Sequence, residues 1–201
     1  MNTYFVNLIF ICLSLLTPEG DSDWKLKKED GDIKIYTRNI QGSVLAEFKG
    51  VATFQNTSMN KILDIILDVP NYSSLFPDCL EAKVLEQKGK YYDIHYFAVK
   101  APWPVKNRDA IYESVTTITE DGKHAHVALN PLGKYLEVKK DFIRMFNGSG
   151  FWELEELETN TIRVTYQFHG DPAGDLPAWL VNSAVVYSPL KTFHNLQSKI
   201  K

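Results

Sequence analysis

The pair Arg108-Asp109 is the sharpest polar feature of the chain. An arginine guanidinium can hold a carboxylate or a phosphate through two parallel hydrogen bonds, so Arg108 is a candidate ligand-binding residue inside a cavity. The alternative is an ion pair or cap that anchors the start of a strand. Removing one partner of a buried ion pair costs about 3–5 kcal/mol, so loss of function there could equally reflect unfolding. We favour the structural interpretation and keep Arg108 as a binding candidate.

Two further groups could do chemistry, and both have simpler explanations. His124 and His126 would share one face of a strand and could ligate a metal, but the sequence places no third ligand beside them. Ser149 lies between Gly148 and Gly150, yet a nucleophile elbow needs a strand before it and a helix after it. Strand patterns flank Ser149 on both sides, which predicts a turn or bulge. We therefore expect no metal, no cofactor and no serine nucleophile.

His95 and Glu113 are candidate general acids or bases on predicted strands. They alternate with the aromatic positions Tyr96 and Tyr112, and the two-residue period of a strand then points them to the opposite face. This predicts that the chain is not an enzyme. A cyclase- or aromatase-type activity on a hydrophobic substrate is the alternative.

Strands must position these side chains. Successive segments alternate or are rich in β-branched and aromatic residues, and short turns join them, which predicts an antiparallel sheet in an α+β domain. A helix over 59–69, capped by Thr57 or Ser58 and stopped by Pro70, interrupts the strands. The predicted strands are 33–38, 44–54, 82–86, 91–99, 110–119, 124–129, 141–146, 151–157 and 161–168.

The last segment of the chain has helical spacing from Pro177 to the C-terminus. More than 20 residues give a helix of about 30 Å, which is long enough to cross a whole sheet. Pro189 should kink this helix rather than end it. A curved sheet gripped by one long helix leaves room for an internal apolar cavity, where ligands bind.

Aromatic residues could line this cavity rather than fill a solid core. Several buried tyrosine hydroxyls along one apolar wall would be hard to satisfy in a dry core. The set comprises Tyr96, Tyr112, Trp152, Tyr166, Phe168, Trp179 and Tyr187.

Three segments carry a resemblance to a known family. Trp24 with 33–38 resembles the opening of START domains, the lipid-transfer domains related to the steroidogenic acute regulatory protein. The run 100–109 resembles the P-x-P-x-x-x-R-D segment of these domains, and 171–182 resembles the start of their C-terminal helix. The three segments occur in the family's order and cover about residues 23–200.

The resemblance implies a helix-grip fold, with a curved antiparallel sheet around a tunnel and the last helix as its lid. It implies a lipid or other apolar ligand that gains access near the lid and a neighbouring loop, for which Pro102-Trp103-Pro104 is the candidate. Some members hold the ligand's polar group with a charged pair, and the positions near Tyr96 and Ser114 that align with it are uncharged here. The expected ligand-binding residues are Tyr96, Arg108, Tyr112, Trp152, Tyr166, Phe168, Trp179, Leu180, Ser183, Ala184 and Tyr187.

Composition limits the partners. The formal net charge is -3 and no Lys/Arg run occurs, so nucleic acid is not an expected partner. We expect a monomer that binds a lipid or another small hydrophobic molecule, with transient membrane contact through exposed Trp103 as an option. Ligand transfer and ligand sensing are both compatible with such binding.

The apolar run 4–16 is too short to span a bilayer, which takes about 20 residues, and its length fits the core of a signal peptide. We therefore expect residues 1–20 to be a signal peptide, 21–201 to be the lipid-binding domain, and the protein to be periplasmic or secreted. An uncleaved N-terminal anchor is the alternative. After cleavage Cys79 would be the sole cysteine, which excludes an internal disulfide.

Overall fold

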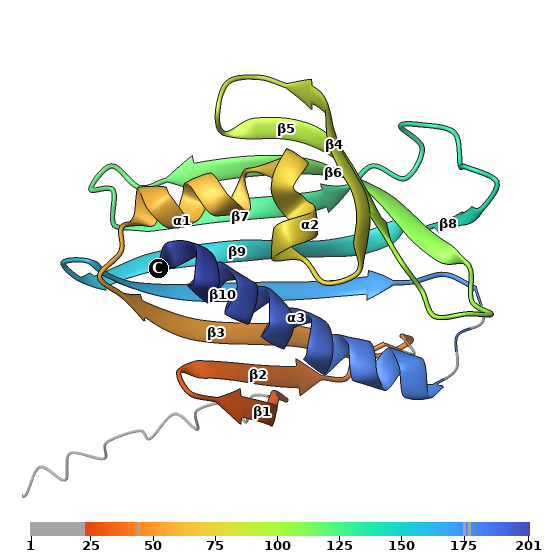
Figure 1. Ribbon diagram of the computed structural model, residues 1–201, viewed down its shortest axis with the longest axis horizontal. Helices are drawn as coiled ribbons and strands as arrows, with labels where there is room; N and C mark the ends of the chain where they lie inside the picture. Colours follow the sequence, from red (N-terminus) through yellow and green to blue (C-terminus); the bar gives the residue numbers. More distant parts are fainter. Residues whose placement is uncertain (1–22, 44, 175, 177) are drawn as a thin grey trace, which may run out of the picture.

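The structure is an open sheet with helices on one face (Figure 1). The computed structural model describes residues 23–43, 45–174, 176 and 178–201, and for 178–183 the backbone alone. The predicted signal peptide therefore lies outside the described residues. The strands are β1 (Lys25–Asp30), β2 (Ile33–Arg38), β3 (Glu47–Gln55), β4 (Cys79–Gln87), β5 (Tyr92–Val99), β6 (Asn107–Ile118), β7 (His124–Pro131), β8 (Phe142–Arg144), β9 (Asn147–Glu158) and β10 (Thr161–Asp171).

The strands pair in the order β1-β2-β3-β10-β9-β7-β6-β5-β4, and each of these neighbours is antiparallel. The expected α+β helix-grip architecture is confirmed. The short strand β8 is an exception within this antiparallel sheet, because it pairs parallel with β6. After β7, residues 132–141 lead the chain past the first residues of β6. It then turns back, so that β8 runs in the direction of β6.

The helices are α1 (Met59–Ile66), the 3₁₀ turn η1 (Val69–Asn71), α2 (Tyr72–Leu75) and α3 (Ala178–Ile200). Ser58 caps α1 as predicted, since its hydroxyl accepts a hydrogen bond from the Lys61 amide at 3.3 Å. The first helix ends at Ile66, before the expected boundary at 69. A separate short helix, α2, follows Pro70. Among the described residues, no helix is both long and apolar enough to cross a bilayer.

Helix α3 packs against β2 and β3 through its C-terminal half (Figure 1). Phe193 and Leu196 are fully buried there. A Cβ atom on Gly50 would lie 2.3 Å from Cε2 of Phe193, so the absence of a side chain at position 50 is what lets the helix approach β3. Pro189 lies within the helix, as predicted.

The glycine-rich segment around Ser149 is a regular strand rather than the expected turn or bulge, because β9 begins at Asn147. A Cβ atom on Gly150 would lie 2.3 Å from the carbonyl oxygen of Gln167 on β10. The glycines therefore allow two strands to approach each other closely. In a sequence, glycine can indicate such a close approach as well as a turn. Strand β1 was not predicted, since all its residues are exposed and it has no apolar face.

Candidate functional site

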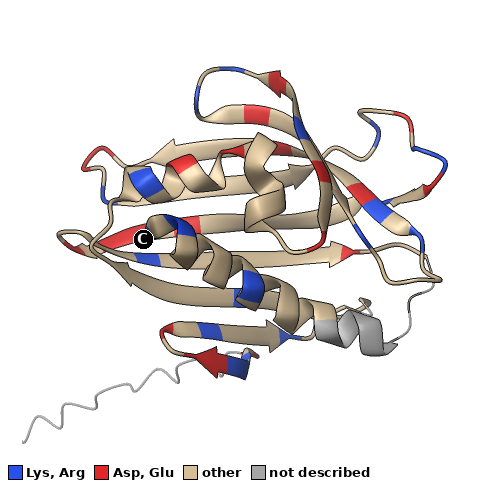
Figure 2. Cartoon of the chain, viewed as in Figure 1, with Lys and Arg blue, Asp and Glu red and all other residues tan. Residues whose placement is uncertain are grey.

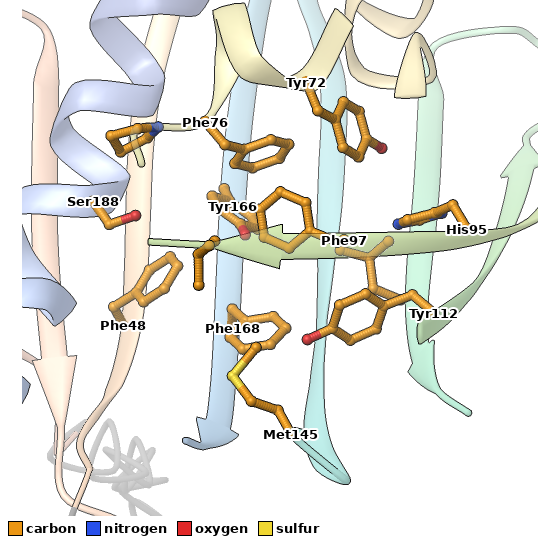
Figure 3. A pocket seen from close by; sticks show the side chains of 13 residues that line it. Phe48, Tyr72, Phe76, His95, Phe97, Tyr112, Met145, Tyr166, Phe168 and Ser188 are labelled. Carbon is orange, nitrogen blue, oxygen red and sulfur yellow. The ribbon is translucent and has the colours of Figure 1, made fainter. Parts of the chain in front are cut away.

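A pocket of about 160 Å³ lies between the sheet and the helices α2 and α3 (Figure 3). Its walls are mostly aromatic, and they come from β3, β5, β6, β7, β10, α2 and α3. The described lining residues are Phe48, Tyr72, Phe76, Pro77, His95, Phe97, Val99, Tyr112, Leu129, Met145, Tyr166, Phe168 and Ser188.

Three of the predicted aromatic residues meet in this pocket. Tyr112, Tyr166 and Phe168 line it, and the regular alternation of β10 places the last two on its inner face. Burial raises the pKa of both tyrosines well above the usual range. Trp152 stacks on Tyr166 with ring centroids 4.0 Å apart, and it supports that ring from behind rather than lining the pocket.

The predicted orientation of β5 was wrong. Tyr96 points to the outer face of the sheet, where it packs with Ile94 and Ile111, while His95 points into the pocket. Segment 132–142 covers this outer face, so β5 is buried on both sides and its sequence shows no clean alternation. Glu113 faces outward as predicted and accepts a hydrogen bond from the Tyr92 hydroxyl at 3.1 Å.

Arg108 is buried but does not line the described pocket. Its guanidinium donates to the backbone carbonyls of Lys106, Pro172 and Ala173, and the last two belong to the segment that leads into α3. Neighbouring Asp109 points to the other face of β6, as successive strand residues do. The geometry fits the structural interpretation of this pair, in which Arg108 anchors the start of β6.

Helix α3 presents a different face from the expected one. Ala184 is exposed and Tyr187 is 55% exposed, whereas Ser188 lines the pocket. The docking of Phe193 against Gly50 sets the rotation of the helix, and spacing within the helix cannot reveal that contact. The side chains of the other predicted residues on this helix, Trp179, Leu180 and Ser183, lie outside the described residues.

A buried polar pair, of which His95 lines the pocket and Asp93 lies next to it, was missed. His95 Nδ1 lies 2.6 Å from Asp93 Oδ1, and the two residues are 2% and 6% exposed. Asp93 faces Ser114 across the β5–β6 ladder, so a charged group lies near one position that the resemblance left uncharged. The available signal was the two-residue spacing of Asp93 and His95, which puts both side chains on one strand face.

An antiparallel sheet that holds a C-terminal helix over an aromatic pocket defines the helix-grip class of domain. Residues 56–185 match the family model described as polyketide cyclase/dehydrase and lipid transport. The chain belongs to this family, and its resemblance to START domains is confirmed by similar structures.

Three comparisons illustrate the relationship. A STAR-related lipid transfer protein from Xanthomonas axonopodis has a similar structure, with a TM-score of 0.80, 31% identity, and coverage of 89% of this chain and 98% of that chain. An uncharacterized protein of Pseudomonas aeruginosa is 34% identical over 88% of this chain and 86% of its own length. The phosphatidylcholine transfer protein of Homo sapiens is 25% identical over 86% of this chain and 82% of its own length.

Proposed function

We propose that this protein binds a lipid or another small hydrophobic molecule in the pocket and does no covalent chemistry on it. The observation that carries the proposal is the aromatic pocket between sheet and lid helix, in a fold shared with a STAR-related lipid transfer protein. Burial of apolar surface contributes about 25 cal/mol per Å², so an apolar ligand can be held without charged contacts.

Ligand size requires motion. The pocket volume of about 160 Å³ is close to the roughly 150 Å³ cavity that admits benzene in an engineered protein core. A whole lipid is larger and must displace part of the lining. We expect α3 to move, because Ser188 on this helix forms one wall and most of the other described lining residues belong to the continuous sheet.

Filling the pocket tests the proposal. Ser188→Trp places an indole in the pocket and should abolish binding of a fluorescent fatty-acyl lipid, while Lys191→Trp adds the same ring on the exposed side of α3 and should leave binding intact. Lipid extracts of the purified protein, analysed by mass spectrometry, should contain a co-purifying lipid in the wild type and not in Ser188→Trp. Equal binding by both variants, or no binding by the wild type, contradicts the proposal.

We further propose transient contact with a membrane through the loop between β5 and β6. Trp103 at its tip is 92% exposed, and Val99 four residues earlier lines the pocket. Lys100 and Lys106 flank the tip, and Figure 2 shows both basic and acidic segments in the loops at this end of the molecule. Trp103→Ala should slow lipid transfer between vesicles without changing the equilibrium affinity for the lipid. An unchanged transfer rate contradicts membrane contact through this residue.

An enzyme of the cyclase type is the second candidate, and His95 in the pocket is the observation that favours it. A general base must reach the proton that it removes, and His95 is the lining residue best suited to that role. Mass spectrometry of bound ligand before and after long incubation distinguishes the two functions. An unaltered ligand supports a binding protein, and a product that disappears in His95→Phe supports an enzyme.

A further inference from the structure

The pair His95–Asp93 presents one free nitrogen to the pocket. His95 Nδ1 lies 2.6 Å from a carboxylate oxygen of Asp93. A carboxylate only accepts hydrogen bonds, so we assign the proton of this hydrogen bond to Nδ1. In the neutral imidazole Nε2 is then the acceptor. Among the described residues, Nε2 has no hydrogen-bond partner. It is also not one of the fully buried polar atoms that lack a partner. Nε2 is therefore open to the cavity.

The surroundings hold the imidazole in place. Its ring centroid lies 5.6 Å from that of Tyr72, at an interplanar angle of 87°, and 5.8 Å from that of Tyr112. Figure 3 shows His95 at one end of the pocket, beside these two tyrosines. The Tyr72 hydroxyl is already used, since it donates to the carbonyl of Ile66 at 3.0 Å. His95 thus presents a fixed nitrogen acceptor to the pocket, whose other polar side-chain groups include the neutral hydroxyls of Tyr112, Tyr166 and Ser188.

The pocket offers no positive side chain to a ligand. None of the described lining residues is Lys or Arg, and the sequence has neither residue at 1–22, 44, 175 or 177–183. Arg108, whose strand partner Val99 lines the pocket, donates to three backbone carbonyls instead. With the Asp93 carboxylate directly behind His95, an anionic headgroup would add buried negative charge without a counter-charge, which is costly.

The pocket does not suit a cationic group either. The Asp93 carboxylate does not line the pocket, and His95 stands between it and the cavity. An ammonium group would be buried without a counter-charge, because none of the described lining residues is Asp or Glu, and its three donors would compete for the few neutral acceptors of the pocket. A hydroxyl group has a single donor, which matches the imidazole acceptor.

We propose that the pocket selects apolar ligands whose polar end is an uncharged hydroxyl group, which donates its hydrogen bond to Nε2 of His95. Asp93 is a positioning residue that fixes the proton on Nδ1. This inference rests on the proposed binding function and names the ligand class. A phospholipid headgroup, with its phosphate, is disfavoured at this end of the pocket.

Four probes with the same alkyl chain test the ligand class on the full-length protein. They are decan-1-ol, its methyl ether, decanoate and decylammonium, each below its critical micelle concentration and each titrated against a bound fluorescent apolar dye. The alcohol should bind about tenfold more tightly than the ether, which corresponds to roughly 1.4 kcal/mol, and more tightly than either ion. An ether that binds as tightly as the alcohol, or an ion that binds more tightly, overturns the inference while leaving hydrophobic binding intact. Failure of all four probes to bind overturns both.

Variants locate the selectivity. His95→Phe keeps an aromatic ring but removes the acceptor, so the preference for alcohol over ether should fall to less than twofold while ether affinity is retained. His126→Phe replaces an exposed histidine outside the pocket and should keep the full preference. A preference that survives in folded His95→Phe overturns the assignment to His95.

Nitrogen NMR of the His95 ring supplies a readout that does not depend on the fold of a variant. The wild type should show Nδ1 protonated and Nε2 unprotonated, with the Nε2 resonance shifting on addition of decan-1-ol and not of the ether. Asp93→Asn should raise the population of the other tautomer and lower the alcohol preference. An Nε2 resonance that is insensitive to the alcohol contradicts the inference.

Discussion

Asp109 and Arg144 form an ion pair that is almost completely removed from water, with side chains 0% and 1% exposed. The guanidinium donates to both carboxylate oxygens, at 2.8 and 3.0 Å, and its remaining N–H groups donate to the carbonyls of Gly133, Leu136 and Glu137. All five donors of Arg144 are therefore satisfied. The pair fastens segment 132–141 over the outer face of β5 and β6.

Replacing Asp109 by Asn leaves the Arg144 charge buried without a counter-charge. We expect the free energy of unfolding to fall by about 3–5 kcal/mol, as measured by urea denaturation. Glu155→Gln, which removes the partner of the half-exposed Arg163, is the control and should cost less than about 1 kcal/mol. Equal losses in the two variants would show that the buried pair has no special role.

The sequence predicts which side chains of a strand point to the inner face of the sheet wherever the other face of that strand is exposed to solvent. On β10 the buried residues Ile162 and Val164 alternate with more exposed ones, and the inner face was predicted correctly. On β5 both faces are covered, so the pattern does not distinguish His95 from Tyr96. The most informative polar residue of the pocket was therefore assigned to the wrong face, for a reason that lies in segment 132–141, far along the chain.

At the scale of elements, the docking of α3 on β3 depends on the contact between Phe193 and Gly50. Gly50→Ala would put a methyl group 2.3 Å from the Phe193 ring, so the ring or the helix must shift. We expect a loss of stability of about 1–3 kcal/mol, the usual cost of overpacking, and faster hydrogen exchange in α3. Urea denaturation and exchange mass spectrometry measure the two effects.

A double-mutant cycle shows whether the clash itself is responsible. Phe193→Leu removes the ring edge, so the combined variant Gly50→Ala/Phe193→Leu should lose less stability than the sum of the single variants. Strict additivity would mean that the glycine acts through the backbone of β3 rather than through the helix.

The existence of α3 could be predicted from its length, its helical spacing and Pro177, but its rotation could not. Helical spacing defines rows of residues, and only the partner surface selects the row that is buried. Here a glycine on β3 selects Phe193, and Tyr187 is left exposed as a result. The same reasoning applies to Gly148 and Gly150, whose conformational freedom suggests a turn until their strand partners are known.

For the whole molecule, the buried tyrosines connect the pocket to global stability. Burial raises the pKa of Tyr72, Tyr112 and Tyr166 well above the ordinary value, and the charge of Asp93 adds to the effect at Tyr72. In the unfolded chain these phenols lose their protons from about pH 10. Between that pH and the higher pKa of the folded state, the folded protein binds more protons than the unfolded chain does.

Stability should therefore be unaffected by these groups below about pH 10 and should fall as the pH rises above it, by up to about 1.4 kcal/mol per pH unit for each tyrosine. Urea denaturation at constant ionic strength from about pH 9 to about pH 11.5 measures the slope. Tyr166→Phe removes the hydroxyl of a buried residue that lines the pocket, so it should flatten the slope while changing stability little at neutral pH. Tyr91→Phe, at a 40% exposed position, should leave the slope unchanged. An identical slope in the wild type and in Tyr166→Phe would mean that water reaches this hydroxyl freely and that the pocket is wetter than its aromatic walls indicate.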